Sequence, residues 1–160
     1  MSKALVAYFS ATGTTGVIAT KLAETINADC YEIVPADLYT NADLDWRDEN
    51  SRSSIEMKKE PNCRPVIGSA PVDNMDQYDV IFVGYPVWWY ICPKIINTFL
   101  ENYNLSGKTI VLFATSGGSG FGKSVESLED SAPNARIVEG AVLNGVKSAE
   151  ELKAFAKKYL

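Results

Sequence analysis

Between an apolar run and a helical pattern the chain reads Phe9-Ser10-Ala11-Thr12-Gly13-Thr14-Thr15-Gly16. The apolar run, residues 3–9, is typical of a strand buried on both faces of a sheet. Gly13 allows the backbone to turn tightly and to expose its N–H groups. A helix that begins near Thr14 directs its unpaired amides and its positive dipole end at the same point. Hydroxyl side chains are added by Ser10, Thr12, Thr14 and Thr15. The turn therefore predicts a site for a phosphate dianion.

The same turn has a plainer interpretation as a hydroxyl-rich cap of an ordinary strand-to-helix connection. It is not a P-loop, because no Gly-Lys-Ser/Thr follows. It also lacks the carboxylates of a metal-dependent receiver domain and the cysteine and arginine of a cysteine-dependent phosphatase. The residues predict a binding loop without catalytic side chains.

Composition limits the classes of function. A chain of 160 residues is expected to form a single domain, residues 1–160, with a full core. The net charge of −5 disfavours nucleic-acid binding and suits a partner with a basic surface. No histidine is present, which excludes His-based acid–base catalysis and His-containing metal sites, and we expect no metal.

The cysteines and the N-terminus bear on location. The three cysteines are odd in number and widely spaced, as expected of reduced thiols in a cytoplasmic protein. The first apolar run is too short to span a membrane, and the glycine-threonine turn after it is unlike a cleavable signal. We therefore expect a cytoplasmic protein that does not enter a membrane.

Apolar runs alternate with helical patterns along the whole chain. Strands are expected at residues 3–9, 30–34, 80–84, 109–114, and 136–138 with 141–143, the last bulged around Gly140. Helices are expected after the first turn, from Pro93, at 123–129, and after a capping box of Ser148 and Glu151. Strand-then-helix units in this order predict an α/β fold with a parallel sheet and right-handed crossovers.

Residues 36–71 interrupt the alternation with a polar excursion. A helix is expected from about Ser53, which has Glu56 three residues on, to Lys59. Trp46 stands among acidic residues and has two interpretations. We expect it to anchor the excursion to the core, and the alternative is that it covers a ligand.

Two more unusual loops follow the third and fourth strands. In an open α/β sheet, ligands bind outside the carboxyl ends of the strands, where the winding reverses. The third strand is followed by a stiff aromatic wall of Pro86, Val87, Trp88, Trp89 and Tyr90. Such a wall suits the stacking of a planar heterocycle, and the alternatives are a dimer patch or a packed corner.

The loop after the fourth strand is rich in glycine. Its candidate binding residues are Thr115, Ser116, Gly117, Gly118 and Gly120. The spacing fails the dinucleotide pattern GxGxxG. Close approach of the backbone to a ligand ring explains the glycines better than a flexible linker, because the segment joins a buried strand directly to a helix.

With these loops in view, the chain resembles the flavodoxin family of FMN-binding electron carriers. Ser10-x-Thr12-Gly13-x-Thr15 is similar to the family's FMN-phosphate loop, with Thr14 where asparagine is frequent. Gly84-Tyr-Pro-Val-Trp-Trp resembles a loop that borders the isoalloxazine ring in a bacterial subgroup. The resemblance implies a three-layer sandwich with a five-stranded parallel sheet in the order 2-1-3-4-5. It also implies FMN as cofactor, held by the candidate residues of all three loops.

The resemblance implies a function in electron transport. We expect a low-potential carrier between a reductase and an acceptor that bind transiently, because the three loops bring no arginine or histidine to the ring. The protein is expected to be a monomer or weak dimer. Many flavodoxins cover the ring with a tyrosine after the fourth strand, where this chain has Phe121 as the nearest aromatic residue. An open ring face leaves an FMN-dependent NAD(P)H:quinone reductase as the alternative, and a sensor of phosphate ligands as a third reading.

Overall fold

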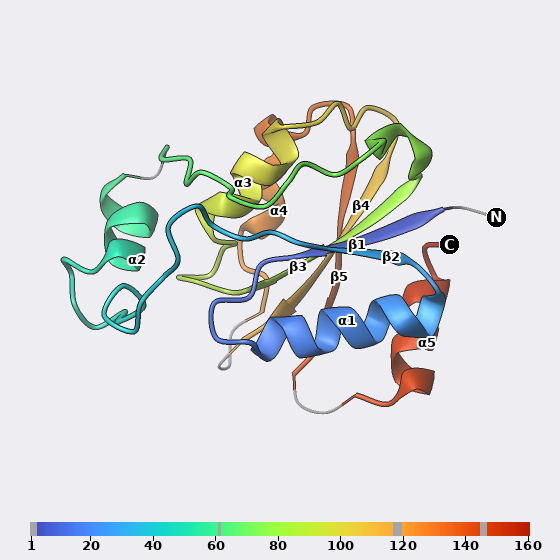
Figure 1. Ribbon diagram of the computed structural model, residues 1–160, viewed down its shortest axis with the longest axis horizontal. Coiled ribbons are helices and arrows are strands. Elements are labelled where there is room, and N and C mark those ends of the chain that lie inside the picture. Colours follow the sequence, from blue (N-terminus) through green and yellow to red (C-terminus); the bar gives the residue numbers. More distant parts are fainter. Residues whose placement is uncertain (1–2, 61, 117–119, 145–146) are drawn as a thin grey trace.

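The protein forms a five-stranded parallel sheet. In this computed structural model the described residues are 3–60, 62–116, 120–144 and 147–160. The strand order is β2-β1-β3-β4-β5, which confirms the predicted order (Figure 1). The strands are β1 (Ala4–Tyr8), β2 (Asp29–Glu32), β3 (Val80–Pro86), β4 (Thr109–Thr115) and β5 (Arg136–Val142).

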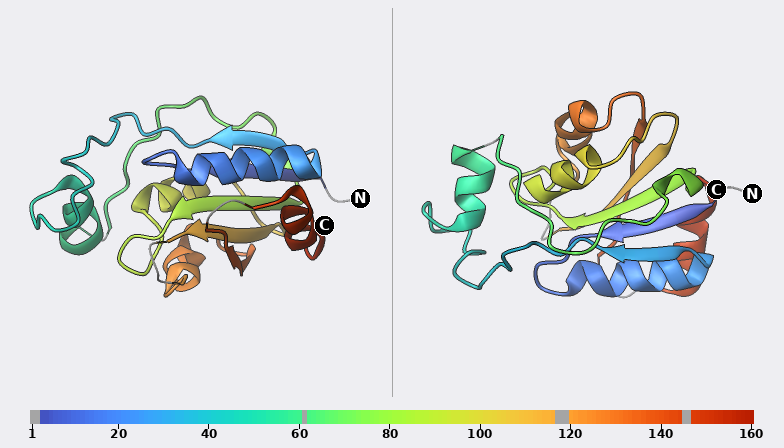
Figure 2. Two further views of the ribbon diagram at one scale, coloured as in Figure 1. Left: turned by 90° about the horizontal axis from the view of Figure 1, so that it is seen from below. Right: turned by 45° about the horizontal axis from the view of Figure 1, so that its top comes forward.

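Helices cover both faces of the sheet, which gives the predicted three layers (Figure 2). One face carries α1 (Thr14–Ile26) and α5 (Ala149–Lys157), and the other carries α3 (Lys94–Glu101) and α4 (Ser124–Leu128). The last of these continues into a 3₁₀ turn, η3 (Glu129–Ser131), and another 3₁₀ turn, η2 (Met75–Gln77), precedes β3. The expected capping box of Ser148 and Glu151 opens α5.

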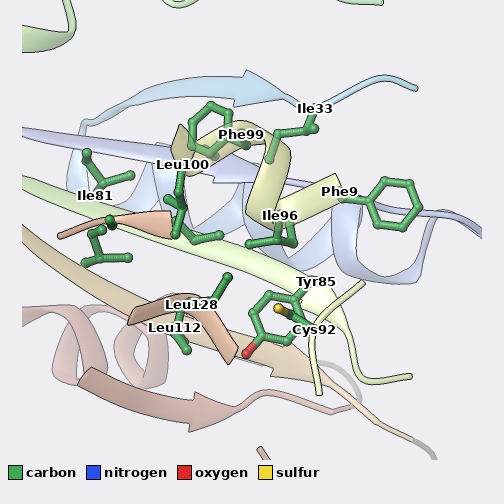
Figure 3. Packing of buried hydrophobic residues seen from close by; sticks show 14 of the residues in the cluster. Phe9, Ile33, Ile81, Tyr85, Cys92, Ile96, Phe99, Leu100, Leu112 and Leu128 are labelled. Carbon is green, nitrogen blue, oxygen red and sulfur yellow. The ribbon is translucent and has the colours of Figure 1, made fainter. Parts of the chain in front are cut away.

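The core consists of two apolar layers separated by the sheet. Successive side chains of a strand point to opposite faces, so Val6 and Phe82 pack under α1 and α5, whereas Leu5 and Ile81 pack under α3 and α4. Figure 3 shows the second layer, in which Ile96, Phe99 and Leu100 of α3 lie over the sheet. Because β1, β3 and β4 are covered on both faces, their sequences are continuous apolar runs.

The expected bulge in the last strand is present. Leu112 of β4 pairs with Glu139, and Phe113 pairs with Ala141, so Gly140 has no partner in the register. A Cβ atom at Gly140 would lie 2.4 Å from the carbonyl oxygen of Leu112. The strand therefore approaches β4 too closely there for any side chain.

The excursion differs from expectation in how its helix begins. The helix starts at Arg52 as α2 (Arg52–Ser54) and widens into a π-helical turn, η1 (Ile55–Lys59). The cap is Ser51, whose hydroxyl accepts a hydrogen bond from the Ser54 N–H at 3.3 Å. The helix expected from about Ser53 to Lys59 is therefore present and begins one residue earlier, at Arg52, because the Ser51 hydroxyl caps it.

The anchor predicted for Trp46 is wrong. Its side chain is 69% exposed, on the rim of the excursion. The residues that attach the excursion to the core are Tyr39 and Ile67, which pack against it. At the base, Pro35 pairs with Ile67, and the Ala36 N–H donates to the Val66 carbonyl at 2.8 Å. The excursion thus leaves and returns at neighbouring points, beyond the carboxyl ends of the strands (Figures 1 and 2).

Candidate functional site

The loops that follow β1, β3 and β4 meet at the carboxyl edge of the sheet. The N–H of Phe9 donates to the carbonyl of Gly84 at 2.9 Å, which joins the first two. The N–H of Val87 donates to the carbonyl of Thr115 at 2.9 Å, which joins the second and third. The structure therefore brings the three predicted loops together.

The first loop opens α1 with free amides. Gly13 is the N-cap residue at φ +92°, a left-handed conformation that favours glycine. The Ser10 hydroxyl accepts the Gly16 N–H at 3.0 Å, and Val17 begins the helical pattern by donating to the Gly13 carbonyl. Within the described ranges, the N–H groups of Thr14 and Thr15 find no protein acceptor. They are available to an anion at the positive end of the helix.

The hydroxyls of this loop divide into two groups. Thr12 and Thr14 are exposed, with their hydroxyl oxygens 3.4 Å apart. Thr15 is buried, and its hydroxyl lies 2.8 Å from that of Thr115. The Thr15 side chain therefore connects α1 to the end of β4, and the side chains of Thr12 and Thr14 are the ones accessible to a ligand.

The aromatic loop ends in a tight turn of two non-glycine residues. The N–H of Trp88 donates to the Ile91 carbonyl at 2.9 Å, and the N–H of Ile91 donates back at 3.1 Å. The central residues Trp89 and Tyr90 have φ of 49° and 65°. This is a type I′ turn, for which Asn-Gly is the usual pair, and holding bulky residues in it costs about 1–2 kcal/mol each. Strain of this kind is often found at binding sites.

The three aromatic residues of that loop have different surroundings. Trp88 packs edge-on against Phe9, with ring centroids 5.7 Å apart, and against Tyr39 at 5.4 Å. Trp89 is half-buried, and Tyr90 is 68% exposed at the tip. Trp88 therefore belongs to the support of the loop, and Trp89 and Tyr90 are the better placed to contact a planar ligand. Pro86 ends β3, and Val87 packs onto the core.

The glycine-rich loop is held at both ends. The N–H of Ser116 donates to the Asn144 side-chain oxygen, and the Asn144 amide donates to the Ser116 carbonyl, both at 2.8 Å. At the other end, the Lys123 N–H donates to the Tyr90 carbonyl at 3.0 Å, beside Gly122 at φ +56°. The candidate residues Gly117 and Gly118 lie outside the described residues, and Gly120 is exposed.

Asn144 was missed from the sequence although it obeys the rule that found the other loops. It is the polar residue that follows Leu143, the apolar residue directly after the end of β5 at Val142. The two hydrogen bonds between Asn144 and Ser116 add the carboxyl end of β5 to the site.

The excursion was missed as a contributor of charge near the aromatic loop. The Tyr39 hydroxyl donates to the Glu56 carboxylate at 2.5 Å, and the Arg52 Nε donates to the same carboxylate at 3.0 Å. Burial first, and then the bond to Glu56, raise the pKa of Tyr39 well above its ordinary value, so the phenol stays protonated. Lys58 lies over the Trp89 ring, with its Nζ 5.4 Å from the centroid. These residues of the excursion are distant in sequence from the three loops, and no motif indicates that they lie beside them.

The described part of the chain offers neither a metal site nor a membrane-spanning helix. No group of three or more metal-ligating side chains lies together there, and no helix there is long and apolar enough to cross a membrane. The three cysteines are all free. Burial raises the pKa of the Cys92 thiol to about 11, so this group is a poor nucleophile.

A free helix N-terminus beside an aromatic loop at the carboxyl edge of a 2-1-3-4-5 sheet defines a flavodoxin-like binding domain. The family model for flavodoxin matches residues 3–159, and the chain belongs to the flavodoxin family.

Solved structures agree with this assignment. A candidate flavoprotein from Bacteroides eggerthii DSM 20697 is 47% identical, with a TM-score of 0.89 over 99% of this chain and 98% of that one. Another from Bacteroides uniformis ATCC 8492 is 45% identical, with a TM-score of 0.88 over 98% of each chain. A flavoprotein from Lactobacillus acidophilus NCFM, solved in complex with FMN, shares the fold at 21% identity, with a TM-score of 0.74 over 99% of each chain.

A curated relative shares part of its length with this chain. The flavodoxin-like domain-containing protein BilS of Clostridioides difficile (strain CD3) is 37% identical over 89 residues. The match covers 53% of this chain and 49% of BilS, so the chain spans about half the length of that relative.

Proposed function

We propose that this protein binds FMN and carries electrons between transient protein partners. The observation that carries the proposal is the N-terminus of α1, where the amides of Thr14 and Thr15 have no acceptor among the described residues and where Thr12 and Thr14 are exposed. Membership of the flavodoxin family supports it, as does the FMN bound by the Lactobacillus protein of the same fold. FMN is preferred to FAD because the loops offer one phosphate cradle.

FMN, when bound, supplies the electron-transfer chemistry, and the chain's residues supply binding and surroundings. The amides at the start of α1 and the hydroxyls of Thr12 and Thr14 would hold the phosphate. Trp89 and Tyr90 would border the ring, and the loop after β4 would approach its edge. The acidic chain and the lack of arginine in these loops favour a low potential, since negative surroundings disfavour added electrons.

The partners and the location belong to the same proposal. A net charge of −5 suits a reductase and an acceptor with basic surfaces that meet this protein transiently. We expect a monomer or weak dimer in the cytoplasm, with neither nucleic acid nor membrane as partner.

The first test is the absorption spectrum of the purified protein before and after incubation with FMN. A flavin spectrum is expected, and a folded sample that stays colourless after incubation would overturn the proposal in favour of a sensor of other phosphate ligands.

Steady-state assays then distinguish an electron carrier from a reductase. A carrier needs a reductase to pass electrons to an acceptor protein, whereas rapid direct oxidation of NADH or NADPH with quinone would identify a reductase.

Thr12→Val is expected to weaken FMN binding about tenfold to a hundredfold and to leave riboflavin binding nearly unchanged. The variant removes one hydroxyl donor to a charged phosphate, which is worth about 1.5–3 kcal/mol. Titration of the variant with each ligand, followed by flavin fluorescence, measures the effect. Thr20→Val is the control, since this exposed threonine lies further along α1 and its hydroxyl donates to the Gly16 carbonyl. An equal loss for both ligands would contradict the assignment of the phosphate to this loop.

Asn144→Ala is expected to weaken FMN and riboflavin equally, by about fivefold. The variant removes both hydrogen bonds to Ser116, of about 1 kcal/mol each before water replaces them, and so loosens the loop near the ring. Asn104→Ala is the matched control, because Asn104 accepts a similar bond from the Ser106 N–H in the connection between α3 and β4. A loss confined to FMN would show that Asn144 acts on the phosphate instead.

A further inference from the structure

The ammonium group of Lys58 lies over the half-buried ring of Trp89. The distance from Nζ to the ring centroid is 5.4 Å, within the range of a cation–π contact. Lys58 belongs to the excursion, in the π-helical turn η1, and Trp89 belongs to the turn after β3. Two segments that are separate in the sequence thus place a positive charge against an aromatic residue of the candidate site.

The excursion is fixed in this position by a second aromatic contact. Tyr39 packs against Trp88, the neighbour of Trp89, with ring centroids 5.4 Å apart and planes at 75°. It also packs against Phe9 at 5.7 Å. The Arg52 guanidinium covers Tyr39 at 3.9 Å from its centroid and binds the Glu56 carboxylate. The helical segment that carries Lys58 is therefore held to the same loop as its target.

The charge of Lys58 is not neutralised by its neighbours in the excursion. The nearby Glu56 carboxylate is occupied by Arg52 and by the Tyr39 hydroxyl. Across the ranges that the structure describes, Lys58 itself forms no ion pair. The adjacent Lys59 differs, because its Nζ donates to the Asn50 side chain at 3.2 Å and so turns back into the excursion.

We infer that Lys58 selectively stabilises the reduced form of the bound cofactor, an inference that rests on the proposed function. Reduced FMN has taken up two electrons and one proton, so its ring carries one more negative charge than oxidised FMN. A cation held against the indole that would border the ring would attract that charge. For unit charges about 10 Å apart near a protein surface, the attraction changes an equilibrium constant by about tenfold, and less where water screens it. Lys58 thus partly offsets the acidic surroundings that lower the potential.

The test compares the affinities for oxidised and chemically reduced FMN, measured anaerobically on the full chain. In Lys58→Met, the ratio of the dissociation constant for reduced FMN to that for oxidised FMN is expected to rise about threefold to tenfold. Lys58→Arg keeps the charge, and Lys59→Met removes the same charge one residue away, so both should keep the wild-type ratio. A role in packing alone would change both affinities together and leave the ratio constant.

Three outcomes decide the matter. A ratio that changes in Lys58→Met and in neither control supports the inference. If Lys58→Met and Lys59→Met show the same ratio of dissociation constants, the inference is overturned. The proposed function still stands in that case, provided that the wild type binds oxidised FMN. Failure of the wild type to bind oxidised FMN would overturn both. The contact itself is tested without cofactor, because an indole ring should shift the Lys58 Cε protons upfield in the NMR spectrum, and Trp89→Leu should abolish that shift.

Discussion

Gly122→Ala is expected to lower the free energy of unfolding by about 2–4 kcal/mol and to weaken FMN binding more than tenfold. Gly122 has φ +56°, and a Cβ atom there would lie 2.0 Å from the carbonyl oxygen of Tyr90. That oxygen also accepts the Lys123 N–H at 3.0 Å. The Tyr90 oxygen and the Lys123 nitrogen are both backbone atoms and cannot rotate away like a side chain. The added methyl group must therefore separate the loop after β4 from the aromatic turn.

Two other glycines separate the cost of backbone strain from the cost of the steric clash. Gly107 has φ +79° and nothing within 4 Å of its would-be Cβ, so Gly107→Ala should cost only about 1 kcal/mol of backbone strain. Gly120 has open space and no left-handed backbone, so Gly120→Ala should change stability by less than about 0.5 kcal/mol. Urea denaturation and FMN titration of the three variants measure both effects. If Gly122→Ala lost no more stability than Gly107→Ala, close packing of the two loops would not be required.

The strands could be predicted because burial on both faces of the sheet produces a clear apolar pattern, whereas their order was predicted from the resemblance to the flavodoxin family. Each central strand is a run of apolar residues, and Gly140 marked the bulge where β5 approaches the Leu112 carbonyl. Ser148 and Glu151 marked the start of α5 through a local pair of hydrogen bonds. These signals all depend on residues close in sequence, which is why they could be read from it.

The excursion could not be predicted to the same extent, because its position depends on contacts that are distant in sequence. Two residues could have anchored it, and only the structure shows that Tyr39 packs against Phe9 while Trp46 stays exposed. The start of α2 depended on a choice between Ser51 and Ser53, which have the same capping chemistry. Local propensity does not decide between such equivalents.

The sequence predicted which loops form the candidate site, but not the contacts that individual side chains make there. The rule that ligands bind at carboxyl ends of strands selected the three loops. It could not say that the Thr15 hydroxyl pairs with that of Thr115, or that Trp88 packs against Phe9 while Tyr90 stays exposed. The left-handed pair in the aromatic turn was also hidden, because bulky residues give no sign of positive φ in a sequence.

Gly84→Ala is expected to lower the free energy of unfolding by about 3 kcal/mol. Gly84 lies in β3, paired with Tyr8 on one side and with Phe113 of β4 on the other. The ring of Phe113, which is fully buried, covers the glycine so closely that an added Cβ atom would lie 2.3 Å from two ring carbons. Close packing on both faces of the sheet leaves the ring no free space into which it can move.

A second substitution tests this explanation directly. Phe113→Leu alone is expected to cost about 1–2 kcal/mol through the cavity it leaves, yet the added methyl group of Gly84→Ala fills part of that cavity. The double variant should therefore be more stable than the sum of the single losses predicts, by about 1–2 kcal/mol. Phe113→Leu combined with Gly107→Ala is the control, because nothing lies within 4 Å of a Cβ at Gly107, and here the two losses should add. Simple additivity in the Gly84 pair, measured by urea denaturation, would mean that the loss in Gly84→Ala arises elsewhere than at the Phe113 ring.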